Sequence, residues 1–203
     1  MSTMKREPSV SEAALLESAS TLLAEDGAEA LSVRRIAAAA GCSTMVVYSR
    51  FGGKQGVVEA LYVEGFERLA RTMKSVRATD DPVADLRRCA QRYRKFALEN
   101  PTYYSVMFER SVPDFEPSDA AITVALGTLG ILAERAQQGI DQGRFPPQDA
   151  LHLAACLWAA NHGVVSLELR HISDPVFGWS KRHLQVIDAM LAGLAGPSRK
   201  ARA

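Results

Sequence analysis

The sequence predicts an all-α protein in which a small N-terminal head of three helices continues through a long helix into a larger α-helical body. Three observations predict this class. Apolar residues recur at spacings of three and four along most of the 203 residues, long alternating or β-branched runs are missing, and capping residues, glycines and prolines separate the periodic segments. We expect the head to span residues 1–53 and the body residues 54–203.

The head repeats one pattern, in which a polar cap is followed by an apolar stripe and then by glycine. The third segment is ambiguous by itself, because Met45–Tyr48 would also suit a strand. Its helical neighbours favour a helix. The expected helices are bounded by the capping box Ser9-x-x-Glu12 and Asp26-Gly27, by Ser32 and Gly41, and by Ser43 and Phe51.

The body is expected to consist of longer helices that begin at serine, aspartate or proline and end at asparagine or glycine. Apolar residues in each step by three and four, as one buried face of a helix requires. The expected bounds are Lys54 to near Thr79, Asp81 to Asn100, Pro101 to about Arg110, Ser118 to Gly143, Pro146 to about His171, and a last helix after Asp174-Pro175.

Composition excludes several classes of protein. Lys and Arg number 24 against 23 Asp and Glu, so any DNA contact must come from a local basic patch. No stretch approaches about 20 uninterrupted apolar residues and the start lacks a secretory core, which predicts a cytoplasmic protein with no membrane partner. Widely spaced Cys42, Cys89 and Cys156 predict reduced thiols, with no metal and no cofactor. Catalytic motifs such as H-E-x-x-H are missing, so we expect no catalytic residue and no enzyme.

The charged residues between Ser32 and Gly56 are all basic. DNA phosphates require such a concentration of positive charge, and the amino termini of the short helices add N–H donors. A solvated helix face is the alternative for an arbitrary basic run, but the two tight turns favour a helix-turn-helix motif whose second helix, residues 44–51, enters the major groove. The four residues, a local charge of +4, are Arg34, Arg35, Arg50 and Lys54.

The segment from Ser32 to Lys54 resembles the DNA-binding signature of the TetR family of bacterial regulators. This resemblance implies a DNA-binding transcriptional regulator with an all-helical fold. Met45 stands where the family commonly has glycine, and Arg50 where it commonly has histidine, so a bulkier and more cationic reading surface is expected. The residues that fall at the family's intervals are Ile36, Ala37, Ala40, Gly41, Ser43, Tyr48, Phe51 and Lys54.

The resemblance also implies roles for single residues. Ser32, Ser43, Tyr48 and Lys54 are expected to anchor phosphates, whereas Thr44, Met45 and Ser49 face the floor of the groove, and Arg34 does either. Met45 suits a thymine methyl and Arg50 a phosphate or a guanine edge, although either residue can instead pack or stay solvated. The predicted DNA-binding residues are Ser32, Arg34, Arg35, Ser43, Thr44, Met45, Tyr48, Ser49, Arg50 and Lys54.

Two stripes in the body suit a homodimer, which the resemblance to the TetR family favours and which would place two reading helices about 34 Å apart on a palindromic operator of double-stranded DNA. One consists of small residues and the other of leucine and isoleucine, as in half of an intermolecular four-helix bundle. The alternative is that both stripes fill the core of a single protomer. They comprise Ala154, Ala155, Ala159, Ala160 and Gly163, and Leu184, Ile187, Leu191 and Leu194.

The body is also rich in aromatic and thioether side chains, which suit a pocket for a small apolar or aromatic effector. Trp158-x-x-x-His162-Gly163 resembles the C-terminal domain of the Trp-His-Gly branch of the TetR family. The alternative is that these side chains form the core and that His162 is a satisfied core histidine. The predicted ligand-binding residues are Tyr93, Phe96, Tyr104, Met107, Phe108, Phe115, Trp158, Asn161 and His162.

The predicted function is therefore a regulator of transcription, a repressor rather than an activator, because blocking polymerase requires only that the operator be occupied. The competing interpretation is an α-helical interaction protein whose basic face from Arg87 to Lys95 meets an acidic partner. A strong dependence of DNA affinity on salt separates the two, because each phosphate contact releases counterions.

Overall fold

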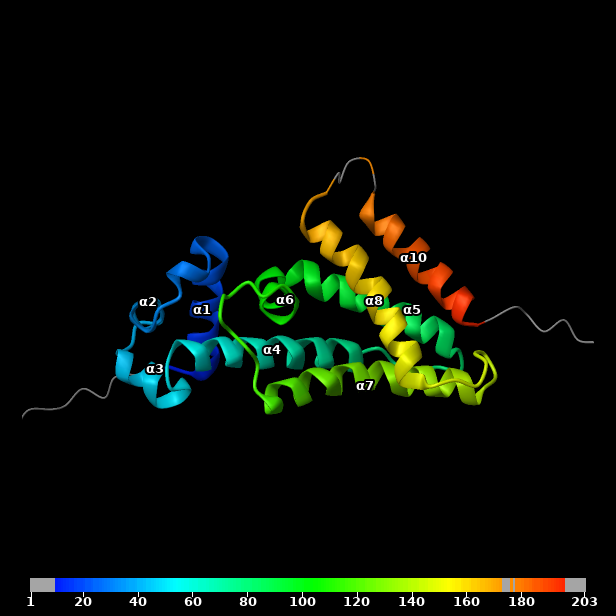
Figure 1. The fold of residues 1–203 in the computed structure, drawn as a ribbon, viewed down its shortest axis with the longest axis horizontal. Helices are drawn as coiled ribbons and strands as arrows, with labels where there is room; N and C mark the ends of the chain where they lie inside the picture. Colours follow the sequence, from blue (N-terminus) through cyan, green and yellow to red (C-terminus); the bar gives the residue numbers. More distant parts are fainter. Residues whose placement is uncertain (1–9, 173–175, 177, 196–203) are drawn as a thin grey trace, which may run out of the picture. The chain divides into compact units, whose positions relative to one another are not determined.

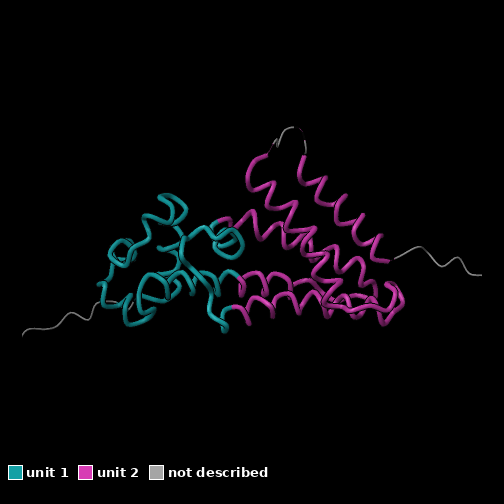
Figure 2. Tube along the Cα trace, in the orientation of Figure 1, with its two compact units in different colours: residues 1–65, 102–121 teal, residues 66–101, 122–203 magenta. Residues whose placement is uncertain are grey.

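The computed structural model describes residues 10–172, 176 and 178–195, and within these residues it contains helices and no strand (Figure 1). The all-α prediction is thus confirmed for the described part of the chain. The chain forms two compact units, residues 1–65 with 102–121 and residues 66–101 with 122–203 (Figure 2). The unit boundaries fall within the helices α4 (Lys54–Lys74), α6 (Pro101–Phe108) and α7 (Asp119–Asp141).

The first unit contains three short helices that pack in sequence order, α1 (Glu12–Asp26) on α2 (Val33–Ala39) and α2 on α3 (Thr44–Phe51). Leu15, Ile36 and Val47 form their common core, since each of these side chains is fully buried. Burying a side chain of this size stabilises the fold by roughly 1.5–3 kcal/mol. One apolar face on each helix therefore suffices to hold the head together.

The observed capping residue of α2 is the predicted one, whereas that of α1 differs from the prediction. Ser32 caps α2 as predicted, because its hydroxyl oxygen accepts a hydrogen bond from the Arg35 N–H at 3.3 Å. The cap of α1 is not the predicted capping box at Ser9, which lies outside the described residues. Ser11 fills this position, with its Oγ 3.1 Å from the Ala14 N–H, so Glu12 is the first helical residue.

The rest of the first unit comes from α4, α6 and the loop before α7. The rings of Tyr62 and Phe115 lie 5.9 Å apart, and Met107 packs directly against Gly65. Ser118 caps α7 as predicted, because its Oγ accepts from the Ala121 N–H at 3.2 Å. The loop is thus held by contacts with α4 and by its own helix cap.

The second unit is built around α5 (Pro82–Glu99), α8 (Ala150–Leu169) and α10 (Trp179–Leu194), which pack against one another. The predicted start of α8 at Pro146 is wrong. Asp149 caps this helix by accepting hydrogen bonds from two backbone N–H groups, and the preceding segment instead buries Phe145 against Gly139. The predicted start of α10, Asp174-Pro175, lies outside the described residues, and the described helix begins at Trp179.

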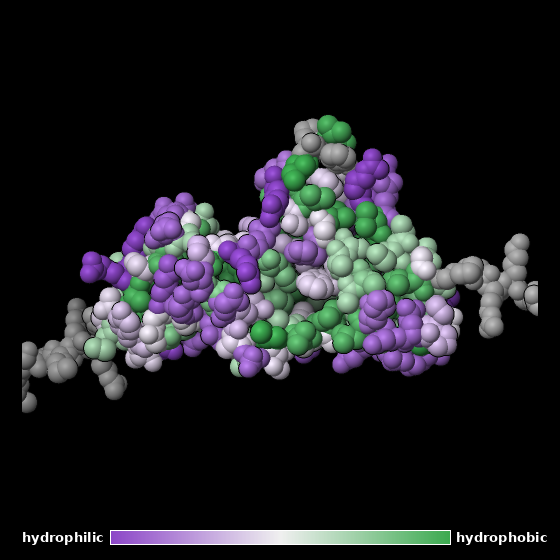
Figure 3. Space-filling view, viewed as in Figure 1, coloured by the Kyte–Doolittle hydropathy of each residue, from purple (hydrophilic) through white to green (hydrophobic). Residues whose placement is uncertain are grey.

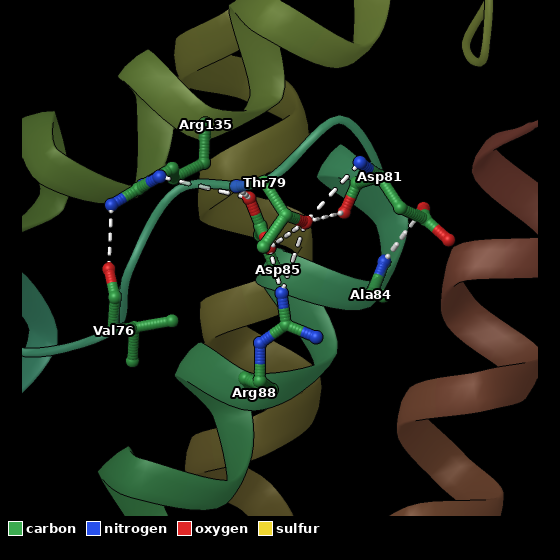
Figure 4. Close-up of polar contacts among 7 residues, drawn as sticks. All are labelled: Val76, Thr79, Asp81, Ala84, Asp85, Arg88 and Arg135. Carbon is green, nitrogen blue, oxygen red and sulfur yellow. Dashed lines mark hydrogen bonds and ion pairs between the residues drawn. The ribbon is translucent and has the colours of Figure 1, made fainter.

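The first long helix, α4, is shorter than predicted: it ends at Lys74 and not near Thr79. The segment after it is held in an extended connection by Asp85 of α5, which is fully buried (Figure 4). The Asp85 carboxylate accepts from the Thr79 N–H and hydroxyl, both at 2.8 Å, and also binds Arg88. Arg135 of α7 lies 3.7 Å from Asp85 and donates to the Val76 carbonyl at 2.8 Å.

By its length and composition alone, α8 is long and apolar enough to cross a membrane. It contains no uninterrupted apolar run of that length. Asn161 and His162 interrupt the apolar sequence near its middle. Only 33% of its most apolar window is buried within the chain. Hydrophobic side chains accordingly gather over α8 on the face seen in Figure 3.

Candidate nucleic-acid interface

α2 and α3 are joined by a tight turn that only glycine fits without strain. The N–H groups of Gly41 and Cys42 donate to the carbonyls of Ala38 and Ala37, at 3.2 Å and 2.9 Å, and Gly41 has a φ of +66°. This pairing is a Schellman motif, which ends a helix and reverses the chain. The turn therefore sets the angle between α2 and α3, as a helix-turn-helix motif requires.

The outward face of α3 is unusually apolar for an exposed surface. Val47 points into the core and is fully buried, whereas Met45 is 73% exposed and Tyr48 is 55% exposed. Thr44, Ser49 and Arg50 are exposed as well. A large apolar side chain held in solvent by a short, well-packed helix is suited to a surface that binds a partner.

The four basic residues of this segment differ in their surroundings. Arg34 and Arg50 are exposed, and within the described ranges neither has an ion-pair or hydrogen-bond partner. Arg35 instead pairs with Asp26 of α1, so its charge is compensated in part. Lys54 is half-buried and donates one hydrogen bond to the Ala28 carbonyl at 3.3 Å. Its ammonium keeps two further donors, which remain available to a phosphate.

The predicted serines also differ. The Ser32 oxygen caps α2, as described above, and the Ser49 hydroxyl donates to the Val46 carbonyl at 3.0 Å. Ser43 lies at the first position before α3, is exposed and makes no capping bond with its side chain. Its hydroxyl and the first N–H groups of α3 are therefore both available to an anion.

One residue that sequence reasoning missed is Gly56, in the first turn of α4. A Cβ atom at this position would lie 1.7 Å from the Phe51 carbonyl oxygen, so the end of α3 and the start of α4 touch through backbone alone. Gly52 and Gly53 supply the left-handed turn between these helices, with φ of +72° and +143°. The chain pattern indicates the turn but gives no sign of the close approach at Gly56.

The predicted ligand-binding residues do not gather in one unit. Tyr93, Phe96, Trp158, Asn161 and His162 belong to the second unit, and Tyr104, Met107, Phe108 and Phe115 belong to the first. Tyr93 and Phe96 are buried, as are Tyr104 and Met107, whereas Trp158 is exposed. Their role as a ligand pocket stays a prediction.

Within the second unit, polar side chains of this set make defined contacts with neighbouring helices. The Tyr93 hydroxyl lies 3.4 Å from His162 Nδ1, and the rings of Trp158 and His162 are 6.0 Å apart. Asn161 is buried and its Oδ1 lies 2.6 Å from His183 Nε2 of α10. Asn161 is thus satisfied inside the unit, which favours a core role for its amide.

Burial changes the ionisation of two side chains in the second unit. Burial, with a smaller contribution in the same direction from the nearby Arg94 guanidinium, lowers the pKa of His183 to about 4. It also raises the pKa of the Cys89 thiol to about 11. Cys89, Cys42 and Cys156 are all free, as the sequence predicted.

A short helix with an exposed outer face that follows a glycine turn, in a head of three packed helices, is typical of a helix-turn-helix DNA-binding protein. Residues 15–61 match the family model described as bacterial regulatory proteins of the tetR family, and residues 86–194 match the model of the tetracyclin repressor-like C-terminal domain. The chain belongs to the TetR family of DNA-binding transcriptional regulators. The C-terminal description does not name the Trp-His-Gly branch, so that assignment stays a prediction.

A curated relative agrees with this family, and solved structures share the fold. The HTH-type transcriptional regulator Rv1816 of Mycobacterium tuberculosis is 30% identical over 190 residues, covering 78% of this chain and 80% of the relative. A protein of unknown function from Rhodococcus sp. RHA1 has a TM-score of 0.80 at 23% identity, over 96% of this chain and 100% of its own. The transcriptional regulator FadR of Bacillus subtilis, solved in complex with stearoyl-CoA, has a TM-score of 0.75 at 18% identity, over 90% and 99%.

Proposed function

We propose that this TetR family member is a cytoplasmic, non-enzymatic repressor that binds a palindromic operator as a homodimer and is released by a small apolar or aromatic effector. The observation that carries the proposal is the outward face of α3, where Met45, Tyr48 and Arg50 are exposed in a chain of formal net charge +1. We assign DNA binding to residues 1–53 and effector binding with dimerisation to residues 54–203.

The proposed contacts follow from chemistry and exposure. Arg34, Arg50 and the Ser43 hydroxyl suit phosphates, because charged and hydroxyl donors there are exposed to solvent. Lys54 reaches a phosphate with the donors that Ala28 leaves available. Met45 suits the methyl group of a thymine in the major groove. Arg35 contributes less than its charge suggests, since Asp26 competes with the phosphate.

The proposed dimer uses α8 rather than the stripe predicted on α10. Ile187 and Leu191 of that stripe are buried in the protomer's own core, so they are unavailable to a partner. Ala154 is buried as well, whereas Ala159 and Gly163 are exposed between larger apolar side chains of the same helix. Small exposed residues allow a second helix to approach closely, as four-helix bundles require.

The proposed effector is apolar or aromatic because the body supplies many rings and few charged groups to its interior. Stearoyl-CoA, the ligand of the Bacillus subtilis FadR structure, is a suitable first probe of this class. An effector must bind the DNA-free state more tightly, and DNA must weaken its binding by the same factor. A screen in which no apolar compound changes operator affinity would remove the effector from the proposal and leave DNA binding intact.

The test is selection of binding sites from random duplex DNA, followed by a salt titration on the selected site. We expect a palindromic sequence and, for about eight phosphate contacts per dimer, a slope near −7 of log affinity against log salt. A flat response or no enriched sequence contradicts the proposal. A reporter promoter carrying the selected site should lose activity when the protein is expressed, whereas a rise would assign an activator.

A further inference from the structure

A second basic surface lies in the second unit, and it is concave. The connection after α4 and one face of α5 line an open hollow of about 460 Å³. Half of the residues that line it are cationic and none is acidic, whereas the chain as a whole is almost neutral. The lining residues are Ser75, Val76, Arg77, Thr79, Arg88, Gln91, Arg92 and Lys95.

The register of α5 explains why these charges converge. Two of its basic residues turn to other helices, where Arg87 donates to Asp188 of α10 at 2.6 Å and Arg94 to Glu168 of α8 at 2.7 Å. The other three are spaced by four and three, which places them on one helix face. The acidic partners of α8 and α10 thus compensate one side of α5 and leave the other side basic. The basic side carries Arg88, Arg92 and Lys95.

Two of the four cations that line the hollow have carboxylate partners. Asp85 holds Arg88, but this buried carboxylate is shared with Arg135 (Figure 4). Glu99 lies 3.6 Å from Lys95 in an exposed pair, which solvent screens. Asp81 is committed to the cap of α5, where its Oδ1 accepts from the Ala84 N–H at 3.1 Å.

The remaining two cations are open to a ligand. Arg77 and Arg92 are exposed, and within the described part of the chain neither has an ion-pair or hydrogen-bond partner. A guanidinium presents a planar fork of donors that matches a phosphate group in two-point contact. Gln91 adds a neutral hydrogen-bonding group to the same lining. The volume also falls within the usual range of about 300–1,000 Å³ for small-ligand sites.

We propose that this hollow binds a small ligand through a phosphate or pyrophosphate group, held by Arg77 and Arg92 and supported by Lys95 and Gln91. A duplex backbone presents phosphates in a regular row along a convex ridge, and it is bound by an element that enters a groove or tracks the backbone. Cations converging on one concavity instead match a compact polyanion. The inference does not depend on the proposed effector or on the sense of regulation.

The test is isothermal titration of the full chain with inorganic pyrophosphate at low ionic strength. The double variant Arg77→Ala/Arg92→Ala is expected to weaken pyrophosphate binding at least ten-fold relative to wild type. Arg144→Ala removes an exposed arginine outside the hollow and is expected to stay within two-fold. No binding by wild type, a smaller loss in the double variant, or an equal loss in Arg144→Ala overturns the proposal.

A second measurement separates a small ligand from DNA. Binding of a random 30-base-pair duplex, followed by fluorescence anisotropy, is expected to change less than three-fold in the Arg77→Ala/Arg92→Ala variant. A larger loss would assign the hollow to the DNA backbone and overturn the proposal. Because both substituted side chains are exposed, the variant is expected to unfold at the wild-type temperature, which a thermal melt checks.

Discussion

Gly56 has no side chain, and this allows the backbones of α3 and α4 to approach closely in the DNA-binding head. Its neighbour in space is the Phe51 carbonyl oxygen, 1.7 Å from where a Cβ would stand. Both groups belong to backbone, so neither can rotate away as a side chain does. The angle between α3 and α4 therefore depends on the missing methyl group.

We expect Gly56→Ala to lower the free energy of unfolding by roughly 1–3 kcal/mol, the usual cost of overpacking, and to weaken DNA binding because α3 shifts. Urea unfolding followed by circular dichroism measures the loss. Gly130→Ala is the matched control, because an added Cβ there meets nothing within 4 Å. Within a helix that change should stabilise the protein by about 0.4–1 kcal/mol. Equal stability of wild type and Gly56→Ala would contradict the packing described here.

His183 predicts a dependence of stability on pH. Its folded pKa of about 4 lies below the ordinary 6.5, because burial and then the Arg94 cation disfavour the charged ring, while Glu168 opposes the shift. Its contribution is complete above pH 6.5 and is lost as the pH falls from 6.5 through 4. Between pH 7 and pH 5 this amounts to about 2 kcal/mol.

The measurement is urea unfolding at both pH values for wild type and for His183→Gln, which does not titrate. Wild type is expected to lose about 2 kcal/mol more than the variant over this interval. His171→Gln, at an exposed histidine, serves as the control and should behave as wild type. Parallel losses in wild type and His183→Gln would show that folding does not lower the pKa of His183.

At the scale of the element, the DNA contacts proposed for α3 are of two kinds, which a salt titration separates. Arg50→Ala is expected to reduce the salt slope of operator binding by about 0.9 for each phosphate that the arginine neutralises. Met45→Ala should leave the slope unchanged and relax preference at one base pair, at a cost of about 1–3 kcal/mol. Binding to the selected operator and to single-base variants measures both. An unchanged slope in Arg50→Ala would assign this residue to a base edge or to solvent.

The sequence predicts helix boundaries well where a local signal sets them. Ser32 begins α2 and glycines end α2 and α3, because caps and positive φ values depend on neighbours in the chain. Prediction fails where contacts with residues distant in the sequence set a helix boundary. α4 ends early because Asp85, eleven residues beyond its last residue, binds the connection after it. Likewise Pro146 signals a helix start, but burial of Phe145 against Gly139 delays that start to Asp149.

The same distinction applies to the candidate site. Spacing and exposure of Met45 and Tyr48 follow from the period of α3, with Val47 on the opposite face. The pairing of Arg35 with Asp26 does not follow, because it joins α2 to α1 across the fold. On α10, periodicity identified an apolar stripe but could not tell a protomer's own core from a dimer surface. Ile187 and Leu191 belong to the core.

At the scale of the whole molecule, α8 offers an apolar surface that the protomer leaves open. Leu151, Trp158 and Leu167 are exposed along this helix, although its other face packs against α5 and α10. Exposed apolar patches of this kind on a globular protein mark interaction surfaces. A second copy of the same helix would cover the patch with its own equivalent, as a two-fold axis requires.

We therefore expect the double variant Leu151→Glu/Leu167→Glu to be monomeric, because charges placed in a dimer interface lose hydration without gaining a partner. Analytical ultracentrifugation measures the mass, and operator binding should fall because one monomer reads one half-site. Leu126→Glu is the matched control, since Leu126 is 62% exposed on α7 and lies outside this patch. It should remain dimeric. A wild-type protein that sediments as a monomer, or a double variant that stays dimeric, would place the subunit contact elsewhere and remove α8 from the interface.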